Sequence, residues 1–164
     1  MRKVIIAGVA SLITVLAISG TSSLQALPNS VGGLFINPAG MRFEEFGARK
    51  LTWEPNAKLL ADWELWTADN ARQPNVEVLK LKQKAIVFGL EASEVTVHRK
   101  DNQVLKFNVF FGPGTEVEKI EKNIGLWADG KWDQVANTIN HGAVTLKLSQ
   151  VKGGTHVEFL PKQS

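Results

Sequence analysis

Two tryptophans, an aspartate and a histidine in the C-terminal half are the residue types best suited to a binding site. Trp127 and Trp132 flank Asp129, and His141 follows them along the chain. Flat indole faces can hold a sugar ring or a peptide side chain, although core packing is the usual role of a tryptophan. We therefore take Trp127, Asp129, Trp132 and His141 as candidate binding residues.

A secreted hydrolase with a site near His141 and Asp133 is the alternative function. Serine hydrolysis requires a serine beside a histidine that a carboxylate orients. Ser93 lies near His98 in the sequence, but the chain has no Gly-x-Ser-x-Gly motif. Pairs of carboxylates are not specific either, because the chain has 16 acidic residues. Since no coherent catalytic constellation emerges, we predict no catalytic residue and favour a non-catalytic function.

Metal and cofactor chemistry is also poorly represented. The chain has no cysteine, which excludes thiol nucleophiles, iron–sulfur clusters and cysteine-based zinc sites. Its three histidines, His98, His141 and His156, lack the spacing that would direct two imidazoles at one ion. The Gly112–Thr115 turn lacks the lysine of a phosphate-binding loop. We expect no metal and no cofactor.

The N-terminal segment has the features of an export signal. Arg2 and Lys3 precede an apolar run from Val4 to Ile18, and small residues lead to Ala26. A run this short falls below the roughly 17 to 25 residues of a membrane-spanning helix. We predict a signal peptide over 1–26, and no stable membrane span after cleavage. The mature protein would be periplasmic or extracellular.

Charge and composition limit the classes of molecule that the protein is expected to bind. The chain carries a net charge of +3, but Arg2 and Lys3 leave with the leader, so the mature protein is nearly neutral. Such a chain lacks the basic surface of a nucleic-acid-binding protein. The absence of cysteine and of Asn-x-Ser/Thr glycosylation sites favours a bacterial envelope setting. The expected partner is an unknown protein or small ligand, with nucleic acid excluded.

The segment 27–56 is rich in glycine and proline, which predicts an irregular lead-in with one helical turn near Met41–Phe46. Its aromatic residues are expected to pack against the rest of the fold; they are Phe35, Phe43, Phe46 and Trp53. Residues 57–164 are predicted to form a single α+β domain. Within it, 59–66 fits both a helix face and a strand, and we favour the strand.

Two hairpins follow from the alternation of apolar residues. In the first, a three-residue loop, 100–102, keeps Val95 and Val97 on the face of Phe107 and Val109, with Asn102 left-handed. In the second, 153–154 forms a two-residue turn that pairs Leu148 with Phe159. Each hairpin then has one apolar face and one polar face, which is typical of an antiparallel sheet covered on one side.

Two helices are predicted between the hairpins. The first begins at Thr115 with a capping box to Glu118 and carries an apolar stripe at helical spacing as far as Trp127. The second, shorter helix runs over 132–139 and ends at Asn140–Gly142.

The fold class predicted is α+β, an antiparallel sheet of about five or six strands with one main helix, 115–127, packed on its apolar face. The function favoured is that of an exported binding or accessory domain that uses a sheet face or edge. A structural envelope domain remains open beside the hydrolase alternative.

Overall fold

The computed structural model describes residues 30–31, 34–35, 41–55, 59, 62–67, 73–128 and 130–163. The expected signal peptide, 1–26, and Asp129 lie outside the described residues. Of residues 30–35, two short strands are described, β1 (Ser30–Val31) and β2 (Leu34–Phe35), which pair with each other. The side chain of Phe35 is not among those described.

The body of the fold is a seven-stranded antiparallel sheet with strand order β3-β4-β7-β8-β11-β10-β9. Its strands are β3 (Trp63–Thr67), β4 (Glu77–Leu81), β7 (Glu94–Lys100), β8 (Gln103–Phe111), β9 (Thr138–His141), β10 (Val144–Val151) and β11 (Gly154–Pro161). A separate small hairpin is formed by β5 (Ala85–Val87) and β6 (Leu90–Ala92). The strand favoured for 59–66 is present from Trp63 onward.

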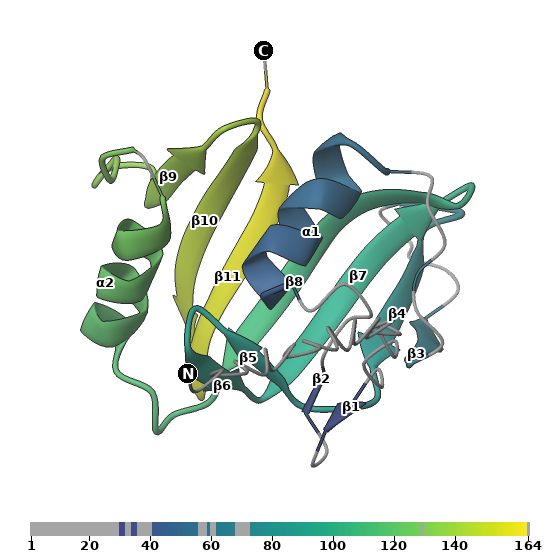
Figure 1. Cartoon of the computed structure of the whole chain (residues 1–164), viewed down its shortest axis with the longest axis horizontal. Coiled ribbons are helices and arrows are strands. Elements are labelled where there is room, and N and C mark those ends of the chain that lie inside the picture. The colour runs from purple at the N-terminus through teal and green to yellow at the C-terminus, as the bar shows by residue number, and fades with distance from the viewer. Residues whose placement is uncertain are drawn as a thin grey trace, which may run out of the picture.

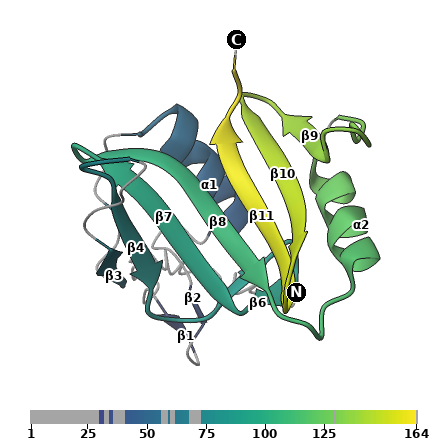
Figure 2. The same cartoon turned by 180° about the vertical axis from the view of Figure 1, so that it is seen from behind.

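One face of the large sheet is covered and the other is not. Both helices lie on the covered side, while the view from behind shows the large sheet with no described helix in front of it (Figure 1, Figure 2). Alternate residues of β8, β10 and β11 are buried on the covered side, as the apolar alternation predicts. The predicted fold class is therefore confirmed, with seven strands in the main sheet.

The β7–β8 turn is shorter than expected. It consists of Asp101 and Asn102, with φ angles of 50° and 65°, so the left-handed Asn102 is confirmed and the three-residue loop is wrong. A register shift after His98 places one extra residue on β8. This bulge pairs Val97 with Phe107, which keeps both on the covered face.

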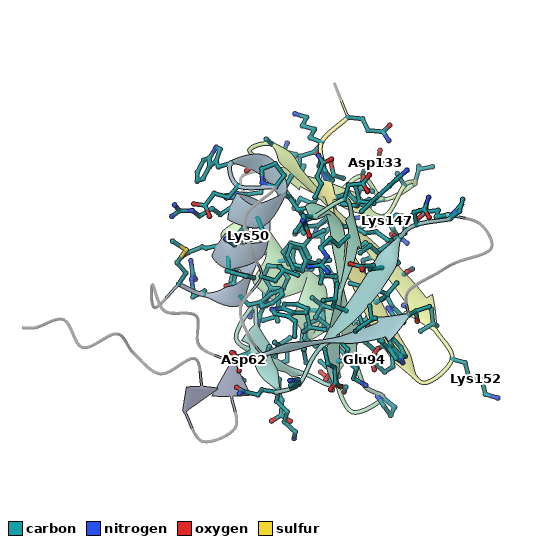
Figure 3. All side chains as sticks on the ribbon, turned by 90° about the vertical axis from the view of Figure 1, so that its right-hand side faces the viewer. Lys50, Asp62, Glu94, Asp133, Lys147 and Lys152 are labelled. Carbon is teal, nitrogen blue, oxygen red and sulfur yellow. The ribbon has the colours of Figure 1, made fainter. Side chains whose placement is uncertain are left out.

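The β10–β11 turn lies one residue before the predicted one. Val151 pairs with Gly154, so Lys152 and Gly153 form the turn and Leu148 lies opposite Val157. Lys152 projects from the tip of this hairpin (Figure 3). A Cβ atom added to Gly154 would lie 2.0 Å from the carbonyl oxygen of Phe111. Gly154 is therefore required where β11 meets β8, and the turn forms ahead of it.

Helix α1 (Phe43–Thr52) is longer than the single turn predicted near Met41–Phe46. Its first turn carries Glu44 and Glu45 and its last turn Arg49 and Lys50, an order that complements the helix dipole. The helix lies across β8, β10 and β11 at the centre of the covered face (Figure 1). The helix over the middle of the sheet is thus α1, and the 115–127 segment lies beside it.

The core between α1 and the sheet is aromatic. The Phe43 ring meets the Phe107 and Phe159 rings edge-on at centroid distances of 5.9 and 6.2 Å. Phe46 and Trp63 also contact Phe107, each with its ring centroid about 6 Å away. Such edge-to-face contacts add to the large apolar area that these rings bury. The expected inward packing of Phe43 and Phe46 is confirmed.

Helix α2 (Val117–Trp127) buries the predicted stripe, with Ile120 and Ile124 fully inaccessible. It lies beside β9 and β10 (Figure 1). The predicted capping box at Thr115 is wrong, because Glu116 is the N-cap residue and makes no side-chain cap bond. The amide of Thr115 instead donates to the Gly112 carbonyl in a turn, which delays the helix start.

The second predicted helix, over 132–139, is wrong. Asp133 and Thr138 exchange backbone hydrogen bonds of 2.8 and 3.2 Å around a tight turn. The Asp133 carboxylate accepts hydrogen bonds from the amides of Val135 and Ala136, a local pattern that competes with helix formation. The chain then enters β9, where Ile139 is buried.

Among the helices that the structure describes, none is long and apolar enough to cross a membrane.

Candidate functional site

Two of the candidate binding residues are in contact. The rings of Trp127 and His141 have centroids 4.0 Å apart and planes inclined at 36°. Trp127 ends the buried stripe of α2, and His141 ends β9, just before a turn in which Gly142 has a φ of 56°. The helix stripe and the turn therefore bring together two residues that are distant in the sequence.

A cavity of about 200 Å³ lies between these two rings and α1. Ala48, Arg49 and Thr52 of α1 form one wall with Trp53, and Trp127, His141 and Val144 form the other. Trp53 is 81% exposed, which corrects the expectation that it packs inward. It follows the end of α1 and stands at the rim of the cavity.

A second cavity of about 400 Å³ lies toward the start of α1. Its lining comes from three elements, with Arg42 and Glu44 from the α1 end, Phe88 and Gly89 from the β5–β6 turn, and Asn123, Leu126 and Trp127 from α2. Leu126 is 79% exposed. Trp127 lines both cavities, so we call the two together the α1 groove.

The floor of the second cavity is held by hydrogen bonds from both helices to one turn. The Phe88 amide donates to the Glu44 carboxylate at 3.2 Å, and the Asn123 side-chain amide donates to the Phe88 carbonyl at 2.7 Å. Phe88 has a φ of 52°, which is uncommon for a bulky residue. Its ring stacks on Phe159 and meets Trp127 edge-on, with centroid distances of 5.6 Å in both cases. These contacts fix the turn in place between the helices.

The charged residues at the groove rim are mostly paired with one another. Arg42 donates to Glu45 at 2.7 Å, and this bond is the main reason that the pKa of Arg42 is raised. At the other end, hydrogen bonds from Lys50 and then Arg49 lower the pKa of Glu54. The cavity beside Trp53 therefore offers chiefly apolar and aromatic surface to a ligand.

The other candidate residues lie elsewhere. Trp132 is partly buried against the core, and a Cβ atom at Gly125 would lie 3.9 Å from its indole nitrogen. Trp132 lines neither cavity of the groove. The Asp133 carboxylate is engaged with its own turn, as described above, and Ser93 Oγ accepts a hydrogen bond from the Gly112 amide.

The remaining histidines lie on the uncovered sheet face. His98 Nε2 is 3.0 Å from the Asn108 side-chain nitrogen, and the His156 ring packs on Phe110. Burial and the nearby Lys106 lower the pKa of His98, while Glu158 opposes this effect. In the described part of the chain, no group of three or more His, Asp or Glu residues is placed to hold a metal ion.

Sequence reasoning missed the α1 side of the groove. Ala48, Arg49 and Trp53 belong to a segment interpreted as irregular lead-in, and their approach to Trp127 depends on how α1 lies on the sheet. The local signal that could have revealed the helix was the placement of Glu45 four residues before Arg49, a spacing that supports a helix.

Comparison of the chain with protein-family models, curated proteins and solved structures finds no match.

Proposed function

We propose that this protein is a non-catalytic binding module, exported to the bacterial periplasm or beyond, that holds an extended segment of a partner protein in the α1 groove. The single observation that carries the proposal is the Trp127 ring, which lines two neighbouring cavities. Each cavity has a highly exposed apolar side chain at its rim, Trp53 at one end and Leu126 at the other. Exposed apolar side chains grouped around a hollow favour a contact with another molecule.

The size of the cavity beside Trp53 favours an anchoring side chain of a larger partner over a small-molecule ligand. The cavity beside Trp53 has about 200 Å³, below the roughly 300–1,000 Å³ of small-molecule pockets. It suits one anchoring side chain of a larger partner, as at the centre of many interfaces. Partner binding through such an anchor requires no catalytic group.

The length of the groove sets the spacing between anchors. From Glu44 to Trp53 a helix rises about 13 Å, at about 1.5 Å per residue. An extended chain covers that distance in about four residues, at about 3.3 Å each. A partner segment would therefore place two anchoring side chains about four residues apart, on the same face of the extended chain.

Export is supported by the order of charge, apolar run and small residues within 1–26. The absence of cysteine is compatible with an oxidising compartment, because the fold needs no thiol kept reduced. N-terminal sequencing of the protein secreted from a bacterial host tests this part. A mature protein that begins near Leu27 supports it, and one that retains Met1 contradicts it.

The binding proposal is tested with a random dodecapeptide display library. Enriched peptides are synthesised with a fluorescent label and measured by fluorescence anisotropy. Because an aromatic side chain at the centre of an interface contributes about 1.4 kcal/mol or more, we expect Trp53→Ala to weaken binding at least about tenfold. Leu126→Lys should weaken the same peptides.

Val135→Lys is the matched control. Val135 is 98% exposed but lies in the turn before β9, away from the groove. Its substitution should change affinity less than about twofold, as expected for an exposed position outside the interface. A library that yields no binder, or binders unaffected by both groove substitutions, would overturn the proposal and favour a structural role.

A further inference from the structure

Among the described residues that line the groove, Glu44 is the one charged residue that is buried. It is 2% exposed and lines the cavity beside Leu126. A carboxylate out of water is costly unless opposite charge or hydrogen bonds compensate. What surrounds Glu44 therefore indicates which chemical group the cavity is suited to receive.

The compensation within the described residues is incomplete. One oxygen accepts the Phe88 amide at 3.2 Å, and the other lies 3.6 Å from the Arg42 guanidinium, beyond hydrogen-bond distance. Arg42 directs its hydrogen bonds to Glu45 instead, at 2.7 and 3.2 Å. An ionised carboxylate offers about four acceptor positions, so Glu44 retains acceptor capacity.

Glu44 lies in the first turn of α1. The positive end of the helix dipole stabilises a carboxylate there without a bound cation. Its hydrogen bond to the β5–β6 turn also fixes the carboxylate beside the cavity. A partner's donor group would meet an acceptor that is already oriented.

The other walls suit an alkyl stem that ends in a positive charge. Trp127 is half-buried and lines the cavity, and an indole ring attracts a cation toward its face. Leu126 offers apolar surface along which the methylene stem of a lysine or arginine can lie. Asn123 is already committed to the Phe88 carbonyl, so the unmet demand in this cavity is for a donor.

We infer that the Glu44 cavity is a subsite for a basic side chain, lysine or arginine, of the partner segment. This inference rests on the proposed function, since it names the chemistry of one of the two anchors. The second anchor, beside Trp53, is apolar. The partner would thus carry an aromatic or aliphatic residue and a basic residue about four positions apart.

The test uses the tightest peptide from the display library. Each position outside its apolar anchor is replaced in turn by lysine or by norleucine, which keeps an alkyl stem without the ammonium group. At one position we expect lysine to bind at least about tenfold more tightly than norleucine, as for a hydrogen-bonded charge pair. Lysine that never exceeds norleucine would overturn the inference.

Three variants assign the preference to Glu44. Glu44→Gln keeps an acceptor for the Phe88 amide but removes the charge, and it should reduce the preference to less than about twofold. Glu118→Gln removes an exposed charge on α2 that lines neither cavity, and it should leave the preference in place. Arg42→Ala should enlarge it, because the competing guanidinium is gone. Persistence of the preference in Glu44→Gln would contradict the assignment.

The two proposals fail in different ways. If no peptide binds, or if Trp53→Ala has no effect, the binding function fails. If peptides bind and depend on Trp53 while showing no preference for lysine, only the basic subsite fails. Hydrogen exchange at the Phe88 amide shows whether Glu44→Gln leaves the turn folded.

Discussion

Replacing Gly154 by alanine tests the register of the β10–β11 hairpin. The added Cβ atom would lie 2.0 Å from the Phe111 carbonyl oxygen and 2.8 Å from the Phe110 ring. An ordinary carbon–oxygen contact is about 3.3 Å or longer, so β11 would have to move away from β8 by more than about 1 Å. Such a shift disrupts the end of the ladder, where Thr155 pairs with Phe111.

The expected cost follows from what is lost. Two backbone hydrogen bonds contribute about 1 kcal/mol each, and overpacking adds about 1–3 kcal/mol. Gly154→Ala should therefore lower the free energy of unfolding by about 3–5 kcal/mol. At about 3–4 °C per kcal/mol for a domain of this size, the Tm should fall by roughly 10–20 °C.

Gly153→Ala is the matched control. Gly153 has a φ of 93°, but a Cβ atom there meets nothing within 4 Å. Its cost is therefore the backbone strain alone, about 1–2 kcal/mol, partly offset by a less flexible unfolded chain. Both variants are compared by thermal unfolding followed by circular dichroism. Equal losses, or a larger loss for Gly153→Ala, would refute the assigned register.

Three further predictions concern the core, the turns and pH. Ile124→Ala should cost about 3 kcal/mol in urea unfolding, because it leaves a cavity, whereas Leu126→Ala on the exposed side of α2 should cost less than about 0.5 kcal/mol; equal costs would contradict the helix orientation. Asn102→Gly should stabilise the protein by about 0.5 kcal/mol, since Asp-Gly suits this left-handed turn better, and a loss of stability would argue against that turn. The lowered pKa of His98 means that the unfolded chain binds this proton first, so the His98 contribution to stability is complete above about pH 6.5 and is lost as pH falls below it. Between pH 7.5 and 5.5 the His98→Gln variant should lose less stability than the natural chain, and identical losses would count against the pKa shift.

The faces of the strands could be predicted from the sequence more reliably than the turns. The alternation of apolar and polar residues alone placed Val97 and Phe107 on the same face of the sheet, and the structure agrees. This alternation cannot distinguish a three-residue loop from a two-residue turn followed by a bulge, because both leave the apolar side chains of the two strands on the same face of the sheet. The turn before Gly154 escaped prediction for a different reason, since the contact with Phe111 is tertiary.

The helices show the limits of spacing as a signal. The apolar stripe predicted for α2 is confirmed, because Ile120 and Ile124 pack into the hydrophobic core. The same spacing in 132–139 failed because Asp133 bonds to local amides and Asn137 adopts a φ of 52°, which reverses the chain. Local hydrogen bonds outweighed periodicity there.

Half of the groove could be anticipated from the sequence. Trp127 and His141 were identified by residue type, and the fold brings their rings together. The opposite wall was not identified, because only the docking of α1 places Ala48 and Trp53 across from them. The buried position of Glu44 has no local signature, since an acidic residue in a first helical turn is ordinarily solvated.

Chemical-shift mapping of a display-selected peptide on the isotopically labelled protein tests the central claim most directly. We expect the largest amide and side-chain shifts at Ala48, Trp127 and His141, with little change at Asn108 and His156 on the uncovered sheet face. Shifts concentrated at Asn108 and His156, with the groove residues unmoved, would contradict the account.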